Sequence, residues 1–248
     1  MSVYVKFDEW GRMGNRMFQY AFGYILAKQK NTDLFAPALP NFNIESTLTS
    51  LPNTNFISTR SYGFQYVDWS ELLTTSQDII VDSFVQKSRY YIPYRNELIS
   101  LFNIKLNNSI NQNKLVIHIR ETDYCQLNWF LGYNYYKEII TTSGFTDIII
   151  VTDNSKCDTV KKLISEGCVL NTEGIVNQFN VVSDNRAMHD FTTLLYSENI
   201  ALSPSSFSWW AAFLGLHKKI IFPILKNSIW KESPGLDDID LVFPSFLN

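Results

Sequence analysis

Residues Ser203 to Leu214 read SPSSFSWWAAFL, and this stretch decides how the fold is interpreted. The short apolar run Ile200 to Leu202 comes just before it and is typical of a buried strand. Pro204 ends that strand, and an apolar run of helical character starts at Phe207. The pattern predicts a strand, a tight turn and a helix N-terminus that carries serine hydroxyl groups.

The start of that helix is a candidate anion site. The first N–H groups of a helix have no partner inside the helix, and the positive end of the helix dipole lies there. A diphosphate is a natural ligand of such a corner. The alternative is that Ser205 or Ser206 only caps the helix, which is the usual role of serine at this position. The turn alone favours the cap, and other parts of the chain favour the diphosphate.

Length and composition limit the number of domains and the kinds of partner that the chain can have. The chain has 248 residues, of which 46% are hydrophobic and 18% charged, enough for one large domain or two small ones. A net charge of −3 argues against a nucleic-acid partner. Aromatic residues make up 15%, which is a hint of a sugar site, although aromatic side chains more often fill the core. Cys125, Cys157 and Cys168 are scattered without metal-ligand spacing, so we expect a reduced, intracellular protein without a metal.

The N-terminal segment and the apolar runs bear on the cellular location. Met1 to Asp8 is predicted to be a strand rather than a signal peptide, because no basic start precedes a long apolar core. No apolar run is long enough to cross a bilayer. The expectation is a cytoplasmic protein, with peripheral contact at the inner face of a membrane if its substrate is lipid-linked.

Apolar strands that alternate with helices predict an α/β fold with parallel sheets covered on both faces. The polar run Asn107 to Asn113 reads as a linker, which predicts domains at 1–112 and 113–248. The segment from Asn31 to Ser76 gives weak signals. The expected strands are 3–7, 79–84, 115–120, 147–153, 181–182, 200–202 and 219–223, and the expected helices are 15–30, 94–102, 133–142, 155–166, 187–197 and one from 207.

The second informative stretch, His118 to Tyr124, ends one of these strands. Alternation along the strand puts His118 and Arg120 on one face, at the carboxyl end, where ligands bind in open α/β sheets. An arginine there can bind a phosphate with two hydrogen bonds. The alternative is a structural ion pair of Arg120 with Glu121 or Asp123.

Weaker signals come from a loop and three acids. Gly11 to Asn15 can approach a ligand closely, but it matches neither a Rossmann fingerprint nor a Walker loop and is equally consistent with an ordinary turn. Asp153 ends a strand, Asp190 lies early in a helix, and Asp184 is the third acid. Taken together, the residues favour a nucleotide or diphosphate ligand, and they do not reveal the chemistry.

The sequence resembles the α-1,2-fucosyltransferases, glycosyltransferase family 11, in four blocks that occur in family order. Gly11 to Ala21 is similar to the opening Gly-x-x-Gly-Asn-Gln-Met-Phe-Gln-Tyr-Ala, and His118 to Tyr124 to His-Val-Arg-Arg-Gly-Asp-Tyr. Val151 to Asn154 resembles the Ser-Asp-Asp block. Ser205 to Ala212 resembles the closing Asn-Ser-Ser-Phe-Ser-Trp-Trp block almost residue for residue.

The resemblance implies a GT-B architecture, with two Rossmann-like domains facing a cleft, the first on the acceptor side and the second holding the donor. It implies GDP-β-L-fucose as donor, a sugar acceptor, no metal or other cofactor, and inversion to an α-linkage. Arg120 would hold the diphosphate and Asp190 would contact guanine. The expected donor-binding set is His118, Arg120, Asp190, Ser205, Ser206, Phe207, Gly14, Asn15, Arg16 and Asp153.

The chain departs from the family pattern next to Arg120. Glu121 and Thr122 stand where the family has arginine and glycine, which should weaken donor binding unless the acid points away. Arg16 replaces a glutamine, and we hypothesise that it restores the missing charge. Arg16→Ala should then weaken GDP binding markedly, and an unchanged affinity would exclude this compensation.

The function expected from these residues is fucose transfer to a sugar hydroxyl, with O2 of a galactose-type acceptor as the expected position. Asp123 is the candidate catalytic base and Glu121 the second choice, with Arg120 stabilising the leaving group. Two alternatives stay open, namely the same fold with another nucleotide-sugar donor, and an inactive module that binds a glycan or nucleotide. The acceptor and the oligomeric state do not follow from the sequence.

Overall fold

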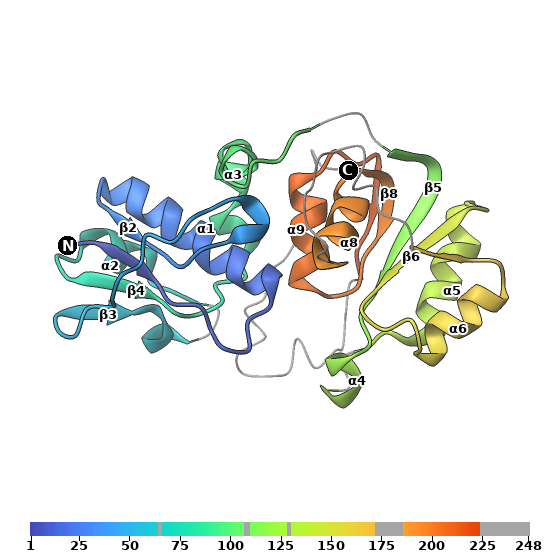
Figure 1. Ribbon diagram of the computed structural model, residues 1–248, viewed down its shortest axis with the longest axis horizontal. Helices are drawn as coiled ribbons and strands as arrows, with labels where there is room; N and C mark the ends of the chain where they lie inside the picture. The colour runs from blue at the N-terminus through green and yellow to red at the C-terminus, as the bar shows by residue number, and fades with distance from the viewer. Residues whose placement is uncertain (64–65, 107–109, 128–129, 172–185, 224–248) are drawn as a thin grey trace. The chain divides into compact units, whose positions relative to one another are not determined.

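The computed structural model describes residues 1–63, 66–106, 110–127, 130–171 and 186–223 (Figure 1). The chain divides into two compact units, and the boundary lies between Ile104 and Lys105. Each unit contains one parallel sheet. This agrees with the predicted α/β class.

The sheet of the first unit has the strand order β2-β1-β4-β3. Its strands are β1 (Val3–Val5), β2 (Leu34–Phe35), β3 (Phe56–Ser58) and β4 (Asp78–Val81), all paired in parallel. The central pair β1 and β4 is buried, because Val3, Val5 and Val81 have no exposed surface. The carboxyl ends of β1 and β4 therefore lie side by side at one edge.

The main helix of the first unit is α1 (Met13–Lys30), as its spacing of apolar residues predicts. Met17, Phe18, Ala21, Ile25 and Leu26 are fully buried along it. A Cβ at Gly23 would come within 2.5 Å of a Val5 methyl group, so glycine lets the helix pack closely on the sheet. The remaining helices are α2 (Trp69–Thr74) and α3 (Arg95–Leu101), with short 3-10 helices at Pro40–Phe42, Thr59–Tyr62, Ser88–Tyr90 and Ile92–Tyr94.

The sheet of the second unit has the order β7-β6-β5-β8-β9 and is parallel throughout. Its strands are β5 (Ile110–Ile119), β6 (Ile148–Thr152), β7 (Val169–Leu170), β8 (Ser197–Ala201) and β9 (Lys219–Ile221). Leu115, Val116 and Ile117 in the central strand are fully buried, as expected for a strand covered on both faces.

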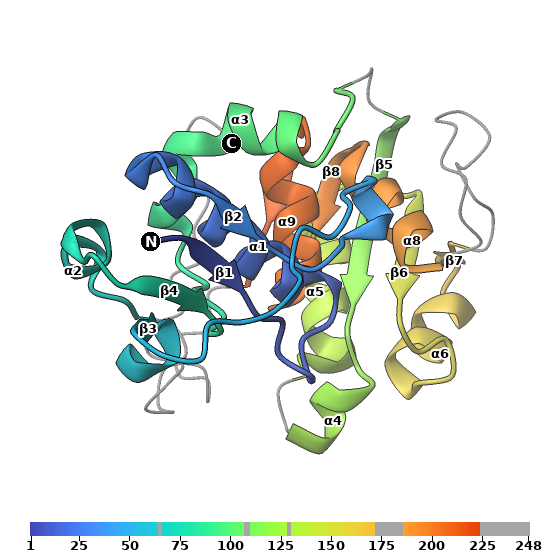
Figure 2. The ribbon, with the colours of Figure 1, turned by 60° about the vertical axis from the view of Figure 1, so that its left-hand side comes forward.

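Helices cover both faces of this second sheet. They are α5 (Gly132–Ser143), α6 (Asp158–Ser165), α8 (Arg186–Leu195) and α9 (Ser206–Leu214), while the short α4 (Asp123–Leu127) lies beyond the end of β5 (Figure 2). Figure 1 shows α5 and α6 on one face and α8 and α9 on the other. Tyr136 of α5 and Leu163 of α6 join the core of the first face, and Trp209, Trp210 and Phe213 of α9 are fully buried.

Several predicted boundaries were wrong. Part of the expected linker is strand, because β5 begins at Ile110, pairs there with Ser197, and resumes through a register shift at Leu115. The helix expected from Ser155 begins at Asp158. Ser197, expected at a helix end, starts β8. The residues 181–182 and Asp184 lie outside the described residues.

Candidate functional site

The candidate site lies at the carboxyl edge of the second sheet. Strands β5, β6 and β8 run parallel, with Ile119 beside Thr152 and Ile117 beside Ala201. Polar residues follow each strand end: Arg120 after β5, Asp153 after β6 and Ser203 after β8. Figure 2 shows α4 following directly on β5 at this end. Ligands of open parallel sheets bind at this edge.

Arg120 is held by two carboxylates. Its Nε and Nη2 donate to the two carboxylate oxygens of Asp123 at 3.0 and 2.9 Å, and Nε lies 3.3 Å from Oδ2 of Asp153. The guanidinium also lies 5.1 Å from the ring centre of Tyr124. Within the described part of the chain, the contacts with the two carboxylates are made by Nε and Nη2 and none by Nη1. The ion pair with Asp123 that the sequence left open is present, and the pair with Glu121 is not.

His118 lies on the same face of β5 as Arg120 and is only 3% exposed. Its Nδ1 lies 2.7 Å from the Ser203 hydroxyl, and its ring centre is 5.6 Å from that of Phe207. Burial, together with the positive charge of Arg120, lowers the pKa of His118 to about 3. The imidazole is therefore neutral at physiological pH and acts as a polar wall of the site.

Tyr124 connects the end of β5 to the turn after β8. Its hydroxyl donates to the carbonyl oxygen of Pro204 at 2.9 Å. Burial raises the pKa of Tyr124 to about 12 against the opposing charge of Arg120, so the phenol stays protonated and keeps this bond. Sequence reasoning gave Tyr124 and Ser203 no role. Their position could have revealed them, because Tyr124 lies in the stretch His118 to Tyr124 and Ser203 begins the stretch Ser203 to Leu214.

The serine turn and the start of α9 follow the predicted pattern. Ser205 occupies the N-cap with extended backbone angles, but its side chain makes no capping hydrogen bond. The N–H groups of Phe207 and Ser208 have no partner among the described residues, while that of Trp209 bonds to the Ser205 carbonyl oxygen. The start of the helix therefore offers backbone donors at the same edge as Arg120.

Glu121 points away from Arg120. It is 4% exposed, and its buried Oε1 has no hydrogen-bond partner among the described residues. Burial, together with the neighbouring Glu121, raises the pKa of the Cys157 thiol to about 12. Cys157 precedes α6, on the opposite face of the sheet from Phe207 of α9. Only the backbone N–H of Glu121 faces the site, donating to Asp153 at 3.3 Å. The added acid is thus directed away from the edge where Arg120 lies.

Asp190 belongs to a buried polar network on α8. Its carboxylate accepts bonds from Arg186 at 3.0 Å and from the side chain of Asn171 at 2.9 Å. Burial raises the pKa of Asp190 against the opposing effect of these two donors. Nε2 of His189, also buried, has no partner in the described part of the chain. Asn171 was missed because it follows a two-residue strand, β7, too short for the periodicity to reveal.

Gly14, Asn15 and Arg16 lie at the start of α1, in the first unit. Oδ1 of Asn15 accepts a hydrogen bond from Gln86 at 2.7 Å. The Arg16 guanidinium lies 5.6 Å from the ring centre of Phe7. These contacts are formed within the first unit, so they organise the glycine loop and the helix that follows it.

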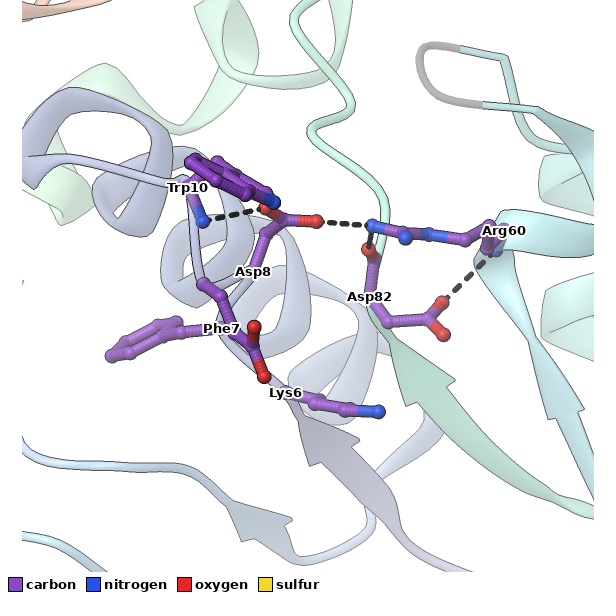
Figure 3. A pocket seen from close by; sticks show the side chains of 7 residues that line it. Lys6, Phe7, Asp8, Trp10, Arg60 and Asp82 are labelled. Atoms are coloured by element: carbon purple, nitrogen blue, oxygen red, sulfur yellow. Dashed lines mark hydrogen bonds and ion pairs between the residues drawn. The ribbon is translucent and has the colours of Figure 1, made fainter.

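The first unit has a pocket of about 310 Å³ at the carboxyl ends of β1 and β4, and sequence reasoning did not single it out. Asp8 and Arg60 point toward each other across it, 2.5 Å apart, with Trp10 beside Asp8 (Figure 3). Desolvation of Asp8 is outweighed by the bonds and charge of its donors, chiefly Arg60, and the pKa of Asp8 is lowered. Its side chain is therefore a carboxylate at neutral pH.

The described residues also show whether metal-ligand groups, membrane-spanning helices and disulfides are present. They contain no group of three or more His, Cys, Asp or Glu side chains that could hold a metal ion. No helix within the same ranges is long and apolar enough to cross a membrane. Cys125, Cys157 and Cys168 are free thiols.

The fold is similar to that of solved fucosyltransferases. NodZ α-1,6-fucosyltransferase soaked with GDP-fucose aligns with a TM-score of 0.51 and 12% identity, over 90% of this chain and 95% of that one. Selenomethionine NodZ from Bradyrhizobium matches equally well, with the same TM-score, identity and coverage. A GDP complex of an Arabidopsis thaliana FUT1 mutant aligns at 0.48, too low to support an argument.

No family model and no curated protein matches the sequence of the chain. At 12% identity the structural matches establish the fold alone. The predicted α/β fold class of the GT-B type is confirmed, with one parallel sheet in each of the two units. Membership of the α-1,2-fucosyltransferase family stays a prediction.

Proposed function

We propose that this protein is a glycosyltransferase that moves L-fucose from GDP-β-L-fucose to a sugar hydroxyl, with inversion and without a metal. The observation that carries the proposal is the position of Arg120. Arg120 follows the last residue of the central strand and forms ion pairs with Asp123 and Asp153. The Tyr124 hydroxyl bonds this strand end to Pro204, in the turn that precedes α9. The resemblance of the fold to NodZ, which was soaked with GDP-fucose, supports the choice of donor.

Departure of GDP leaves negative charge on the diphosphate. Arg120 supplies a fixed positive charge, and the N–H groups of Phe207 and Ser208 supply oriented dipoles. Asp123 and Asp153 hold the guanidinium in place before the ligand arrives, so little ordering is required at the moment of reaction. In this proposal Ser205, Ser206, Phe207 and His118 line the same donor site.

Asp123 fits the role of catalytic base better than Glu121. The Asp123 side chain is 39% exposed, so an acceptor hydroxyl can reach it. Glu121 is 4% exposed, so an acceptor hydroxyl has little access to it. A positioned base contributes on the order of 100- to 10,000-fold in rate. The acceptor hydroxyl would attack the anomeric carbon as its proton passes to Asp123, with O2 of a galactose-type sugar and an α-1,2 linkage as the proposed product.

The remaining donor contacts are proposed from the resemblance. Asp190, held by Asn171 and Arg186, would receive guanine. Gly14, Asn15 and Arg16 would contact the donor from the first unit. Arg16→Ala tests the contact proposed for Arg16: GDP affinity should weaken markedly, and an unchanged affinity would remove Arg16 from the donor site.

The deciding experiment is GDP release from GDP-β-L-fucose in EDTA, with and without a terminal-galactose acceptor. Acceptor-stimulated release is the expected result. No release despite calorimetric GDP binding would indicate another GDP-sugar donor or an inactive binding module. No GDP binding either would contradict the proposal as a whole.

A variant tests the base. Asp123→Asn should lower kcat at least 100-fold. Because Asp123 also positions Arg120, GDP affinity must be measured on the same variant. A loss of kcat with GDP affinity kept within about threefold supports a base, whereas full turnover removes Asp123 from that role.

The partners of the reaction follow from the same proposal. A nucleotide sugar and a glycan acceptor are its substrates, and a lipid-linked acceptor would bring the protein to the inner face of a membrane. Turnover on a lipid-linked acceptor in vesicles, compared with the free glycan, measures that contact.

A further inference from the structure

The pocket of the first unit lies at the edge of its sheet where parallel strands present ligands. Lys6, Phe7 and Asp8 follow β1, and Asp82 follows β4. Its volume of about 310 Å³ falls at the small end of the range for small-molecule sites. The lining residues are Lys6, Phe7, Asp8, Glu9, Trp10, Arg60 and Asp82.

Trp10 is the unusual residue of this pocket. It is 87% exposed, although an indole carries one of the largest apolar surfaces of any side chain. Its loop is nevertheless ordered: the Trp10 N–H donates to Oδ1 of Asp8 at 2.9 Å, and the Gly11 N–H to the Asp8 carbonyl oxygen at 3.0 Å. An exposed aromatic ring held on an ordered turn is a surface on which a ligand can stack.

Polar groups beside the indole are held in fixed positions. Nη2 of Arg60 donates to Asp8 at 2.5 Å and to the carbonyl oxygen of Asp82 at 2.9 Å (Figure 3). The Asp82 carboxylate accepts from the Ser58 hydroxyl at 2.8 Å and from the Arg60 N–H at 3.0 Å. Carboxylates and guanidinium together offer acceptors and donors that suit hydroxyl groups.

The lining of the pocket carries charges of both signs. Two cations, Lys6 and Arg60, face three carboxylates, Asp8, Glu9 and Asp82, so the formal balance of the lining is −1. A neutral ring with several hydroxyl groups can accept hydrogen bonds from the two cations and donate to the carboxylates. A pyranose has such hydroxyls and an apolar C–H face that suits an aromatic ring.

We propose that this pocket binds a pyranose of the acceptor glycan, with Trp10 as the stacking surface and Asp8, Arg60 and Asp82 as the hydroxyl-binding groups. The identity of the occupant as the acceptor rests on the proposed function. The preference for a neutral sugar rests on the pocket alone.

The test is saturation-transfer NMR with the full chain and three probes: methyl β-D-galactopyranoside, methyl β-D-glucopyranoside and lactose. We expect at least one probe to receive saturation from the wild type, and Trp10→Ala to weaken its binding at least fivefold. Trp10→Phe should retain part of the binding, because a smaller ring still stacks. Phe56→Ala is the matched control, since Phe56 is a 38% exposed aromatic of the same sheet that does not line the pocket.

Three outcomes would overturn the proposal. They are binding of none of the probes, equal binding by wild type and Trp10→Ala, and an equal loss in Phe56→Ala. GDP affinity and GDP release on the same variants separate this proposal from the proposed function. Sugar binding that depends on Trp10 without GDP release keeps the pocket as a sugar site and contradicts the transferase. Acceptor-stimulated release that is unchanged in Trp10→Ala keeps the transferase and removes the pocket.

Discussion

The two sheets present their carboxyl edges to ligands in different ways. In the second unit the edge is built into the core: His118 and Ser205 are buried, and Arg120 is held between two carboxylates. In the first unit the edge is open, with Trp10 exposed and the lining balance at −1. Two parallel sheets of different strand order, β2-β1-β4-β3 and β7-β6-β5-β8-β9, thus present polar residues at their carboxyl edges, buried in one unit and exposed in the other.

Burial explains the difference in chemistry. A charged group acts more strongly on a ligand where water is excluded, so the buried edge suits the stabilisation of a leaving diphosphate. An exposed ring and partly exposed carboxylates bind weakly and tolerate different ligands. Changes at the buried edge should thus affect both stability and binding, and changes at the open edge binding alone.

The largest expected effect compares one arginine from each edge. Arg120→Ala should weaken GDP binding on the order of 100-fold, the loss of charge-assisted hydrogen bonds worth about 3 kcal/mol. Arg60→Ala should leave GDP affinity within about twofold. Calorimetry on the two purified variants measures this, and equal losses would mean that the two edges do not differ as proposed.

The next effect is the pH dependence of stability caused by His118. The pKa of His118 is about 3 in the folded state and about 6.5 in the unfolded chain. Between these values the unfolded state binds the extra proton, so stability falls as pH falls from 6.5 toward 3. From pH 6.5 to 5 this residue alone should remove about 2 kcal/mol of the free energy of unfolding.

His118→Gln should flatten this part of the pH profile by the same amount in urea titrations at the two pH values. A variant at the open edge, Trp10→Ala, is the control and should keep the wild-type slope. Identical slopes for His118→Gln and wild type would show that His118 is not buried as a neutral group.

A smaller effect is expected for Tyr124→Phe, which removes the hydroxyl bond to the Pro204 carbonyl oxygen at 2.9 Å. The buried carbonyl loses its partner, so the free energy of unfolding should fall by about 1–2 kcal/mol. GDP affinity should also weaken, because this bond joins the end of β5 to the start of α9. Chemical denaturation and calorimetry on one preparation test both, and unchanged values for both would remove Tyr124 from the link between the strands.

The smallest expected effect is the change in stability caused by Trp10→Ala. Trp10→Ala should change the free energy of unfolding by less than about 0.5 kcal/mol, because an exposed side chain contributes little to the core. Thermal unfolding of this variant beside Tyr124→Phe measures the contrast. A loss above about 1 kcal/mol would place Trp10 in the packing of the first unit.

The sequence by itself determined the fold class, and it predicted the candidate site at the end of β5. Its long periodic segments predicted α1, β5 and α9, because an amphipathic or fully apolar run of that length has few alternatives. Alternation along β5 predicted that His118 and Arg120 share one face. Short elements such as β7 and β3 escaped, since two or three residues carry no period.

Only the tertiary structure decided which residues meet. Asp153 reaches Arg120 because β6 lies beside β5, although 33 positions separate the two residues in the sequence numbering. The direction of Glu121, the network of Asp190 with Asn171, and the pocket around Trp10 likewise depend on neighbouring strands and loops. The physical reason is that hydrogen bonds and burial act over a few ångströms in space, and a single sequence records only the order along the chain.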